Sequence, residues 1–327
     1  MPRRCTQGSS PTTYGIEFFA GFVVALGMTF VIIPWLIPRL KSRGIMGKDL
    51  NKPGKPEVAE MGGIAVVVGF FAGVSVLVGL NGITNTNLLN VSLSAALGAA
   101  FVGMMDDMFN LRQRHKALLP FVLALPFGAV ADSHVVIPHV MELNFGPWMM
   151  LVAAFAVTCA ANAANMLEGF NGLGTGLGII MSLTLIGLCF LHQRLDGAYL
   201  LVPLVGALTA FLWFNKFPAK VFPGDTMMLF MGATIAVAGI LSNLHVQTAF
   251  IFLPMIAEFV LKVRGHFQGE NYASRSSNGF LEYHGRIESV THFHMKSMRL
   301  NEKELVYLIW GLQIAVCMFV VAVDLLL

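Results

Sequence analysis

The chain has 327 residues, of which 56% are hydrophobic and 12% are charged, and its mean hydropathy is +0.72. Soluble domains carry roughly 25% charged residues, so this composition indicates a multi-span membrane protein and excludes an ordinary soluble enzyme. The net charge of +3 is too small to indicate nucleic-acid binding. The four cysteines are scattered without a CxxC pair, which argues against a thiolate metal site and against a disulfide framework.

Ten apolar runs predict ten transmembrane helices in one all-α, polytopic integral membrane domain covering residues 1–327. The runs are Ile16–Pro38, Gly62–Leu80, Leu88–Met105, Ala117–Val130, Trp148–Ala161, Thr175–Leu191, Tyr199–Phe214, Met227–Leu241, Val246–Leu261 and Leu305–Leu327. Several are shorter than the roughly 20 residues that cross a bilayer unaided, and packing inside a bundle would accommodate them. The first run is too long for the core of a cleavable signal, which has roughly 7–15 apolar residues.

The distribution of charge predicts the orientation. Ten spans place both ends on one face, with residues 1–15 as a short extracytoplasmic N-terminus. The loops of the other face hold 18 of the 21 Lys and Arg residues, and they are Arg39–Met61, Asp106–Lys116, Asn162–Gly174, Asn215–Asp225 and Lys262–Glu304. Positively charged loops remain in the cytoplasm, so this face is expected to be cytoplasmic. The longest loop, residues 262–304 between spans 9 and 10, has room only for a small cap.

The first polar cluster, Asp106–Lys116, follows the third apolar run. Asp106 and Asp107 are adjacent, and neighbouring helical positions point in different directions, so at most one of the two should face a given ligand. A solvated helix end explains a bare pair of aspartates equally well. The cations that follow suit a phosphate-bearing substrate, with Lys116 neutralising charge and a carboxylate handling a proton or a metal.

The second cluster, Asn162–Leu173, reads NAANMLEGFNGL. Asn162 and Asn165 are one turn apart and could present two amide oxygens together. Asn171 and Gly172 predict a turn that lets the backbone approach a ligand closely. Alternatively, the asparagines cap a helix end and Glu168 is a solvated loop residue.

The third cluster, Phe222–Thr226, joins an aromatic ring, a Pro-Gly turn, a carboxylate and a hydroxyl at the start of an apolar helix. Asp225 could be the N-cap of that helix. Beside the other clusters a metal site is favoured, because Mg²⁺ takes few protein oxygens and completes its shell with water and phosphates. Asp225 and Asn165 would supply such ligands, with Mn²⁺ as the alternative ion.

The long loop contains Lys262–Phe267 and a His-x-His pair, His292 and His294. The pair suggests zinc, but no third good ligand is near it in the sequence. Contacts of Arg264 and His266 with a phosphate or a sugar are therefore favoured.

Together with DLNKPGKPE at Asp49–Glu57, the three clusters make the chain resemble the polyprenyl-phosphate N-acetylhexosamine-1-phosphate transferases. Within them it looks most like the archaeal and eukaryotic branch that uses dolichyl phosphate, and the resemblance covers essentially the whole chain. It implies transfer of GlcNAc-1-phosphate from UDP-GlcNAc to a polyprenyl or dolichyl phosphate with release of UMP, as the first membrane step of N-glycan assembly. The expected partners are these two substrates and the membrane, with a homodimer left open.

The resemblance also implies roles for individual residues. Asp225 looks like the family's Mg²⁺-binding aspartate and Asn165 like its amide ligand, while Phe222 resembles the aromatic that stacks on uracil. Asn171 and Gly172 resemble residues that shape the nucleotide pocket, and Asn162 is a further substrate-binding candidate. Lys116, Asp106 and Asp107 resemble the lysine and the acidic pair near the phosphates. Asn51 and Lys52 belong to the segment expected near the lipid phosphate, and Arg264 and His266 look like the basic loop that meets the sugar phosphate.

The chain departs from the family in its last cytoplasmic loop, which is shorter than in the eukaryotic transferases, and KVRGHF matches their basic motif only in part. The short loop favours an archaeal cell membrane over the endoplasmic reticulum. The alternatives are another UDP-N-acetylhexosamine for a cell-surface polymer, an ion-coupled transporter and a non-catalytic scaffold. Direct attack by the lipid phosphate is favoured over a phospho-enzyme formed on Asp106 or Asp107.

Overall fold

The computed structural model describes residues 11–326 except 53, 81–85, 138–139, 268, 274 and 278, so residues 1–10 of the expected N-terminal segment lie outside it. The described part is mostly helical, as the sequence predicts. Its helices are α1 (Pro11–Ser42), α2 (Gly63–Gly79), α3 (Thr86–Phe109), α4 (Gln113–Val130), α5 (Met149–Met166), α6 (Leu173–Leu191), α7 (Ala198–Asn215), α8 (Gly224–Leu241), α9 (His245–Ile251), α10 (Leu253–Arg264), α11 (Val290–Ser297) and α12 (Glu302–Leu326), with a 3-10 turn at Gly146–Trp148.

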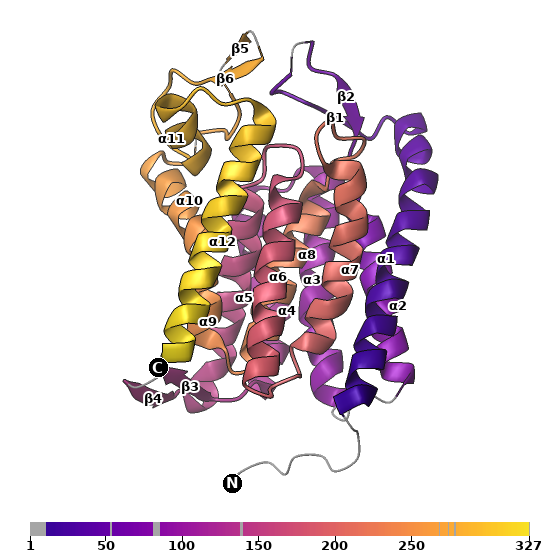
Figure 1. Ribbon diagram of the computed structural model, residues 1–327, viewed down its shortest axis with the longest axis vertical. Coiled ribbons are helices and arrows are strands. Elements are labelled where there is room, and N and C mark those ends of the chain that lie inside the picture. The colour runs from indigo at the N-terminus through magenta and orange to yellow at the C-terminus, as the bar shows by residue number, and fades with distance from the viewer. Residues whose placement is uncertain are drawn as a thin grey trace.

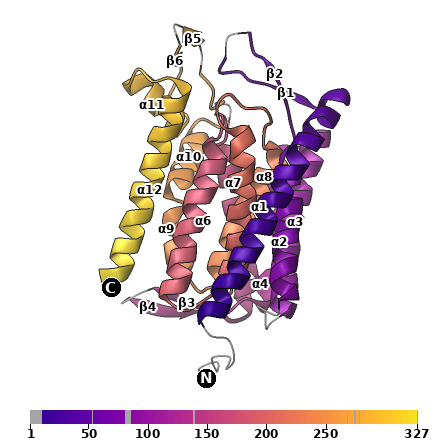
Figure 2. The same cartoon turned by 45° about the vertical axis from the view of Figure 1, so that its right-hand side comes forward.

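The long helices run side by side, and short antiparallel hairpins lie at the two ends of the bundle (Figure 1). At one end are β1 (Met46–Lys48) with β2 (Glu57–Ala59), and β5 (Arg275–Ser277) with β6 (Phe280–Glu282). At the other end lie β3 (His134–Ile137) and β4 (Met141–Asn144), together with the start of α1 and the end of α12 (Figure 2).

Each of the ten apolar runs is helical in the structure. Seven helices in the described ranges are long and apolar enough to cross a membrane, and the ninth run adds an eighth if its two parts count as one span. That run is broken into α9 and α10, which meet at an angle of 59°. Pro254, near the start of α10, has no N–H to continue the α9 ladder, which explains the break. The chain is thus a multi-pass membrane protein by helix length and composition.

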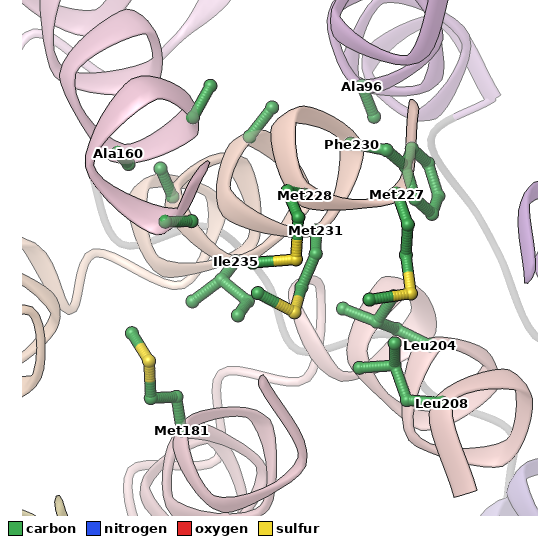
Figure 3. Close-up of a cluster of buried hydrophobic side chains, with 14 of the residues drawn as sticks. Ala96, Ala160, Met181, Leu204, Leu208, Met227, Met228, Phe230, Met231 and Ile235 are labelled. Carbon is green, nitrogen blue, oxygen red and sulfur yellow. The ribbon is translucent and has the colours of Figure 1, made fainter. Parts of the chain in front are cut away.

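Helix α8 forms the centre of the bundle, and its residues from Thr226 to Ile240 are buried. Figure 3 shows its methionines and Phe230 among side chains from α3, α5, α6 and α7, which include Ala96, Ala160, Met181, Leu204 and Leu208. Outer helices instead expose large apolar side chains, such as Phe19 in α1 (68% exposed) and Phe319 in α12 (60%). Such surfaces are unfavourable in water and suit contact with lipid chains.

Two aromatic–cation pairs lie at the ends of α1 and α7, near β1 and β2. The guanidinium of Arg39 lies 3.8 Å from the ring centroid of Trp35, and the ammonium of Lys216 lies 3.9 Å from that of Trp213. Both tryptophans are exposed. Tryptophan rings and snorkelling cations are typical of the membrane–water interface, so this level of the bundle matches one edge of a bilayer.

Helix α3 packs directly against the backbone of α8 at Gly103. A Cβ atom at this position would collide with the backbone carbonyl of Asp225 and would lie 2.6 Å from the backbone nitrogen of Thr226. Backbone atoms cannot move aside as a flexible side chain can. The absence of a side chain at Gly103 therefore sets the distance between α3 and the first turn of α8.

We expect Gly103→Ala to lower the free energy of unfolding by about 1–3 kcal/mol, as overpacking does, and to reduce activity because the turn that carries Asp225 must shift. Thermal unfolding in detergent and turnover measure the two effects. Gly187→Ala in α6 is the matched control, since a Cβ there meets nothing within 4 Å. Equal behaviour of the two variants would contradict the close approach.

Candidate active site

A cavity of about 220 Å³ opens at the end of the bundle that carries β1 and β2. Its walls come from four stretches: the β1–β2 region, the α5–α6 connection, the start of α8 and the segment after α10. The lining residues are Lys48, Asp49, Leu50, Asn51, Glu60, Asn165, Glu168, Gly169, Phe170, Asn171, Phe222, Pro223, Gly224, Asp225, Met228 and Tyr272. The second and third polar clusters of the sequence thus line one cavity. The first cluster joins them through the contacts of Lys116 and Asp107 with Asp225, so all three meet at one end of the bundle, as predicted.

Phe222 is positioned through its backbone. Its N–H donates to the carbonyl of Ala59 at the end of β2 (2.8 Å), and its own carbonyl accepts from Gly62 (2.9 Å). The next carbonyl, that of Pro223, accepts from Gly63 at the start of α2 (2.9 Å). The segment before α8 therefore lies along the β2–α2 connection, and the Phe222 ring is half-buried at the cavity wall.

The start of α8 is capped from α3. Asp107 accepts from the backbone nitrogens of Asp225 (2.7 Å) and Thr226 (3.0 Å) and from the Thr226 hydroxyl (2.6 Å). Gly224 makes room for this carboxylate, because its φ is +67° and a Cβ would lie 2.6 Å from Asp107 Oδ2. The alternative that Asp225 caps its own helix is therefore not what the structure shows.

Asp225 instead pairs with Lys116. The Lys116 ammonium contacts Asp225 Oδ2 and also lies 2.8 Å from Asp106 Oδ2, while the other oxygen of Asp106 accepts from Leu111 N (2.7 Å). The two adjacent aspartates thus face different partners, as their helical spacing predicts. Lys116, Asp106 and Asp107 do not line the cavity themselves and reach it through Asp225.

The two asparagines at the end of α5 have different environments. Asn165 lines the cavity, whereas the amide nitrogen of Asn162 donates to the Thr158 carbonyl of its own helix (2.9 Å). An amide one turn deeper in an apolar helix satisfies its donor locally, because unpaired polar groups are costly there. The predicted contact of Asn162 with a substrate stays a prediction.

Asn171 is held by a buried network. Its side chain accepts from Lys52 and from Ala219 N (both 2.8 Å) and donates to Asp49 (3.1 Å), and its backbone nitrogen donates to Glu302 (3.0 Å). The ammonium of Lys52, predicted to contact substrate, is directed at these protein groups. Gly172, the next residue, is the N-cap of α6 and has a φ of +82°, a left-handed conformation that glycine adopts without strain.

The segment after α10 closes one side of the cavity. Asn51 ties it down, donating to the carbonyl of Gly169 (2.7 Å) and accepting from Ala273 N (3.0 Å). Asn271 donates to the carbonyl of Glu168 (2.9 Å). These contacts place Tyr272 at the cavity, and burial raises the pKa of its phenol to about 12.

Carboxylates dominate the electrostatics of the cavity. Burial raises the pKa of Glu168 to about 7, although the N–H of Gly174, 2.7 Å from its Oε2, acts in the opposite direction. Burial, and then the negative charge of Asp107, also raise the pKa of Glu60. Glu168 is therefore a cavity residue and not a solvated loop residue.

Arg264 and His266 are exposed and do not line the cavity. The guanidinium of Arg264 donates to the carbonyl of Ile287, which braces the segment after α10. Their predicted contact with the sugar phosphate stays a prediction.

The His-x-His pair has a packing environment of its own. The ring of His292 stacks on Tyr283 with centroids 3.6 Å apart, and its Nδ1 accepts from Glu288 N (3.3 Å). Burial lowers the pKa of His292 to about 4, so its ring is neutral. Across the described positions, no three His, Cys, Asp or Glu side chains form a metal-binding group, which leaves the zinc alternative without support.

Sequence reasoning missed Glu60, Tyr272 and Glu302. Glu60 and Tyr272 line the cavity, and Glu302 contacts it through Asn171. None of the three belongs to a polar cluster at the end of an apolar run. The signal available was weak: each is a polar or aromatic residue in or beside a loop of the positively charged face.

Known proteins are similar to this chain along most of its length. A protein of Saccharolobus solfataricus, provisionally named UDP-N-acetylglucosamine–dolichyl-phosphate N-acetylglucosaminephosphotransferase, is 36% identical over 296 residues, which are 89% of this chain and 92% of its own. A Sulfolobus acidocaldarius protein with the same provisional name is 35% identical over 307 residues, with coverages of 91% and 92%. The Saccharomyces cerevisiae enzyme of that name is 30% identical over 310 residues, with coverages of 78% and 68%.

Residues 88–243, from α3 to the end of α8, match the family described as glycosyl transferase family 4. This stretch contains the acidic pair, Lys116, Asp225, and two of the three asparagines that line the cavity, Asn165 and Asn171. With archaeal relatives more than 30% identical along nearly their whole length, the chain belongs to glycosyl transferase family 4.

Proposed function

We propose that this protein transfers N-acetylglucosamine 1-phosphate from UDP-GlcNAc to dolichyl or another polyprenyl phosphate and releases UMP. One observation carries the proposal: Lys116 is held between Asp106 and Asp225 at a cavity walled by Phe222 and Asn171, at one end of an apolar helix bundle. An anionic, water-soluble donor and a lipid acceptor can meet only at such a place. The names of the archaeal and yeast relatives describe this reaction.

A divalent cation, Mg²⁺ or alternatively Mn²⁺, fits the charges of the cavity. Asp49, Glu60, Glu168 and Asp225 line it, while Lys48 is the one basic residue in the lining drawn from described residues. The carboxylates among these that are ionised would repel a diphosphate without added positive charge. Asp225 and Asn165 would hold the ion, and their small number suits Mg²⁺, which keeps water and phosphate ligands. When bound, the ion supplies positive charge at the diphosphate as UMP departs.

Protein groups account for the rest of the reaction. Phe222 and Asn171 receive the nucleotide, and Lys116 neutralises phosphate charge beside Asp225. An oxygen of the lipid phosphate attacks the sugar-bearing phosphorus, the bond from that phosphorus to the UMP oxygen breaks, and UMP leaves. Direct attack is supported because Asp107 is engaged by α8 and Asp106 by Leu111 and Lys116, so neither presents a free carboxylate to the cavity.

Ten spans with the cavity at the cytoplasmic face complete the proposal. The loops at the cavity end hold 18 of the 21 Lys and Arg residues, and positively charged loops remain cytoplasmic. An archaeal cell membrane is the proposed location, supported by the nearly full-length match to archaeal relatives and the greater length of the yeast enzyme.

The direct test incubates purified protein with a polyprenyl phosphate and a panel of UDP-sugars and measures UMP release. Release with UDP-GlcNAc that requires both the lipid and Mg²⁺ is expected. Faster release with UDP-GalNAc would replace the sugar assignment, and no lipid-dependent release from any UDP-sugar would refute the transferase function.

Asp225→Asn should remove most activity while the protein stays folded. The lost charge removes several kcal/mol of transition-state stabilisation, which corresponds to about 100-fold or more in rate. The fold should persist because Lys116 keeps Asp106, and Asp107 still binds the backbone nitrogen of residue 225. UMP release and thermal unfolding are the measurements, and wild-type turnover with Mg²⁺ would disprove the metal role.

Phe222→Ala should weaken UMP binding by about tenfold or more, because base stacking on an aromatic ring contributes roughly 1–3 kcal/mol. Binding of a short-chain polyprenyl phosphate should change little. Titration calorimetry with each ligand separates the two effects, and Phe293→Ala, an exposed ring on α11 outside the cavity lining, is the control. Equal losses for both ligands would mean that Phe222 only packs the helix start.

A further inference from the structure

Glu302 begins the last membrane helix, yet its carboxylate points back to the cavity wall. It is 5% exposed, and its two oxygens serve different groups. Oε1 accepts from the backbone nitrogen of Asn171 (3.0 Å), and Oε2 lies 3.2 Å from the ammonium of Lys52. One side chain of α12 thus joins two loops that are far apart in the sequence.

Helix capping does not explain this contact, because α12 has a cap of its own. Glu304 accepts from the backbone nitrogen of Asn301 (2.8 Å), and the side chain of Asn301 accepts from Glu304 N (3.0 Å). This reciprocal pair is a capping box. Glu302 is therefore available for a different purpose.

The ammonium of Lys52 is held by three protein side chains. Besides Glu302, its ammonium contacts Asp49 and the side-chain oxygen of Asn171 (2.8 Å). An ammonium has three N–H donors and no acceptor. Asp49 and Asn171 accept hydrogen bonds from this ammonium and Glu302 lies within ion-pair distance of it, so the charge of Lys52 holds neighbouring groups in position.

The orientation of the Asn171 amide depends on these partners. Its oxygen is fixed by Lys52 and Ala219, and its nitrogen donates to Asp49 (3.1 Å). Two carboxylates, those of Asp49 and Glu302, already share the one ammonium. A third carboxylate at position 171 would face Asp49 directly, so an amide suits this position electrostatically.

We propose that Glu302 is a positioning residue of the cavity: it holds Lys52 and Asn171 in place and so couples the first turn of α12 to the nucleotide side of the site. The inference rests on the proposed function for its account of what the cavity binds. Glu302 does not line the cavity, and it acts on the nucleotide through Asn171.

The test compares Glu302→Gln with Glu304→Gln, a neighbouring glutamate of the same turn that only caps the helix. Glu302→Gln should raise the KM for UDP-GlcNAc and the Kd for UMP by about tenfold, as loss of a charge-assisted hydrogen bond does. Its kcat at saturating donor should stay within about threefold of wild type. Glu304→Gln should lower the unfolding midpoint without changing KM. A KM that is unchanged in Glu302→Gln, or raised equally for donor and lipid, would overturn the proposal.

Two double variants guard against simple misfolding. Combining Glu302→Gln with Lys52→Met should be no worse for UMP binding than the worse single change, since both act through Asn171, and additive losses would count against the proposal. Asn171→Asp should weaken UMP binding, and adding Asp49→Asn should restore it, because one amide then faces one carboxylate again. Failure of the restored pair to recover would also overturn the network.

UMP binding by calorimetry needs no turnover, so the two ideas can fail separately. A wild-type protein that binds UMP but releases none from UDP-GlcNAc would refute the proposed function while the Glu302 comparison still stands. Normal wild-type turnover with an unchanged Glu302→Gln would refute the positioning role alone.

Discussion

The first turn of α8 is held by a carboxylate from another helix, and the geometry of the cavity depends on that contact. The unpaired N–H groups at a helix start attract negative charge, and Asp107 binds two of them. Gly103, one turn earlier in α3, lets the backbones approach closely enough for this cap. Asp225 is then directed at Lys116, and Phe222 is aligned with β2. A helix–helix contact thereby becomes the framework of a reaction site.

Charge at this end of the bundle is arranged in shared groups. Lys116 lies between Asp106 and Asp225, and Lys52 lies between Asp49 and Glu302. In each case one ammonium serves two carboxylates, so each group keeps an excess of negative charge. A cavity with this balance resists a bare diphosphate and accepts one that arrives with a cation. Binding of the nucleotide and of the metal would accordingly be interdependent, since each offsets the charge of the other.

The sequence predicts those features that depend on local pattern. The helical runs follow from hydropathy, and the meeting of three polar clusters at one end follows from the distribution of Lys and Arg. Contacts between distant segments could not be predicted from local pattern. Nothing in the sequence around Asp107 shows that it caps α8, and nothing in the long loop distinguishes Tyr272 as a cavity residue. The sequence also did not show that Asn165 lines the cavity while Asn162 does not. Helical spacing places both residues on one face, but it does not reveal that the Asn162 amide donates to a backbone carbonyl of its own helix. Pro254 could have predicted the break between α9 and α10, but the apolar run continues through it and was interpreted as one straight span.

The contact between Glu302 and Asn171 also bears on how the enzyme is made. Chains emerge from the ribosome N-terminus first, so three of the four stretches that wall the cavity, the β1–β2 region, the α5–α6 connection and the start of α8, are synthesised well before α12. The carboxylate that fixes Asn171 and Lys52 arrives with the first turn of the final helix. A nascent or truncated chain without α12 therefore leaves the nucleotide side of the site unbraced. Synthesis of α12 is thus the step that supplies this brace, and the nucleotide side of the site reaches its final geometry only when the last helix has packed.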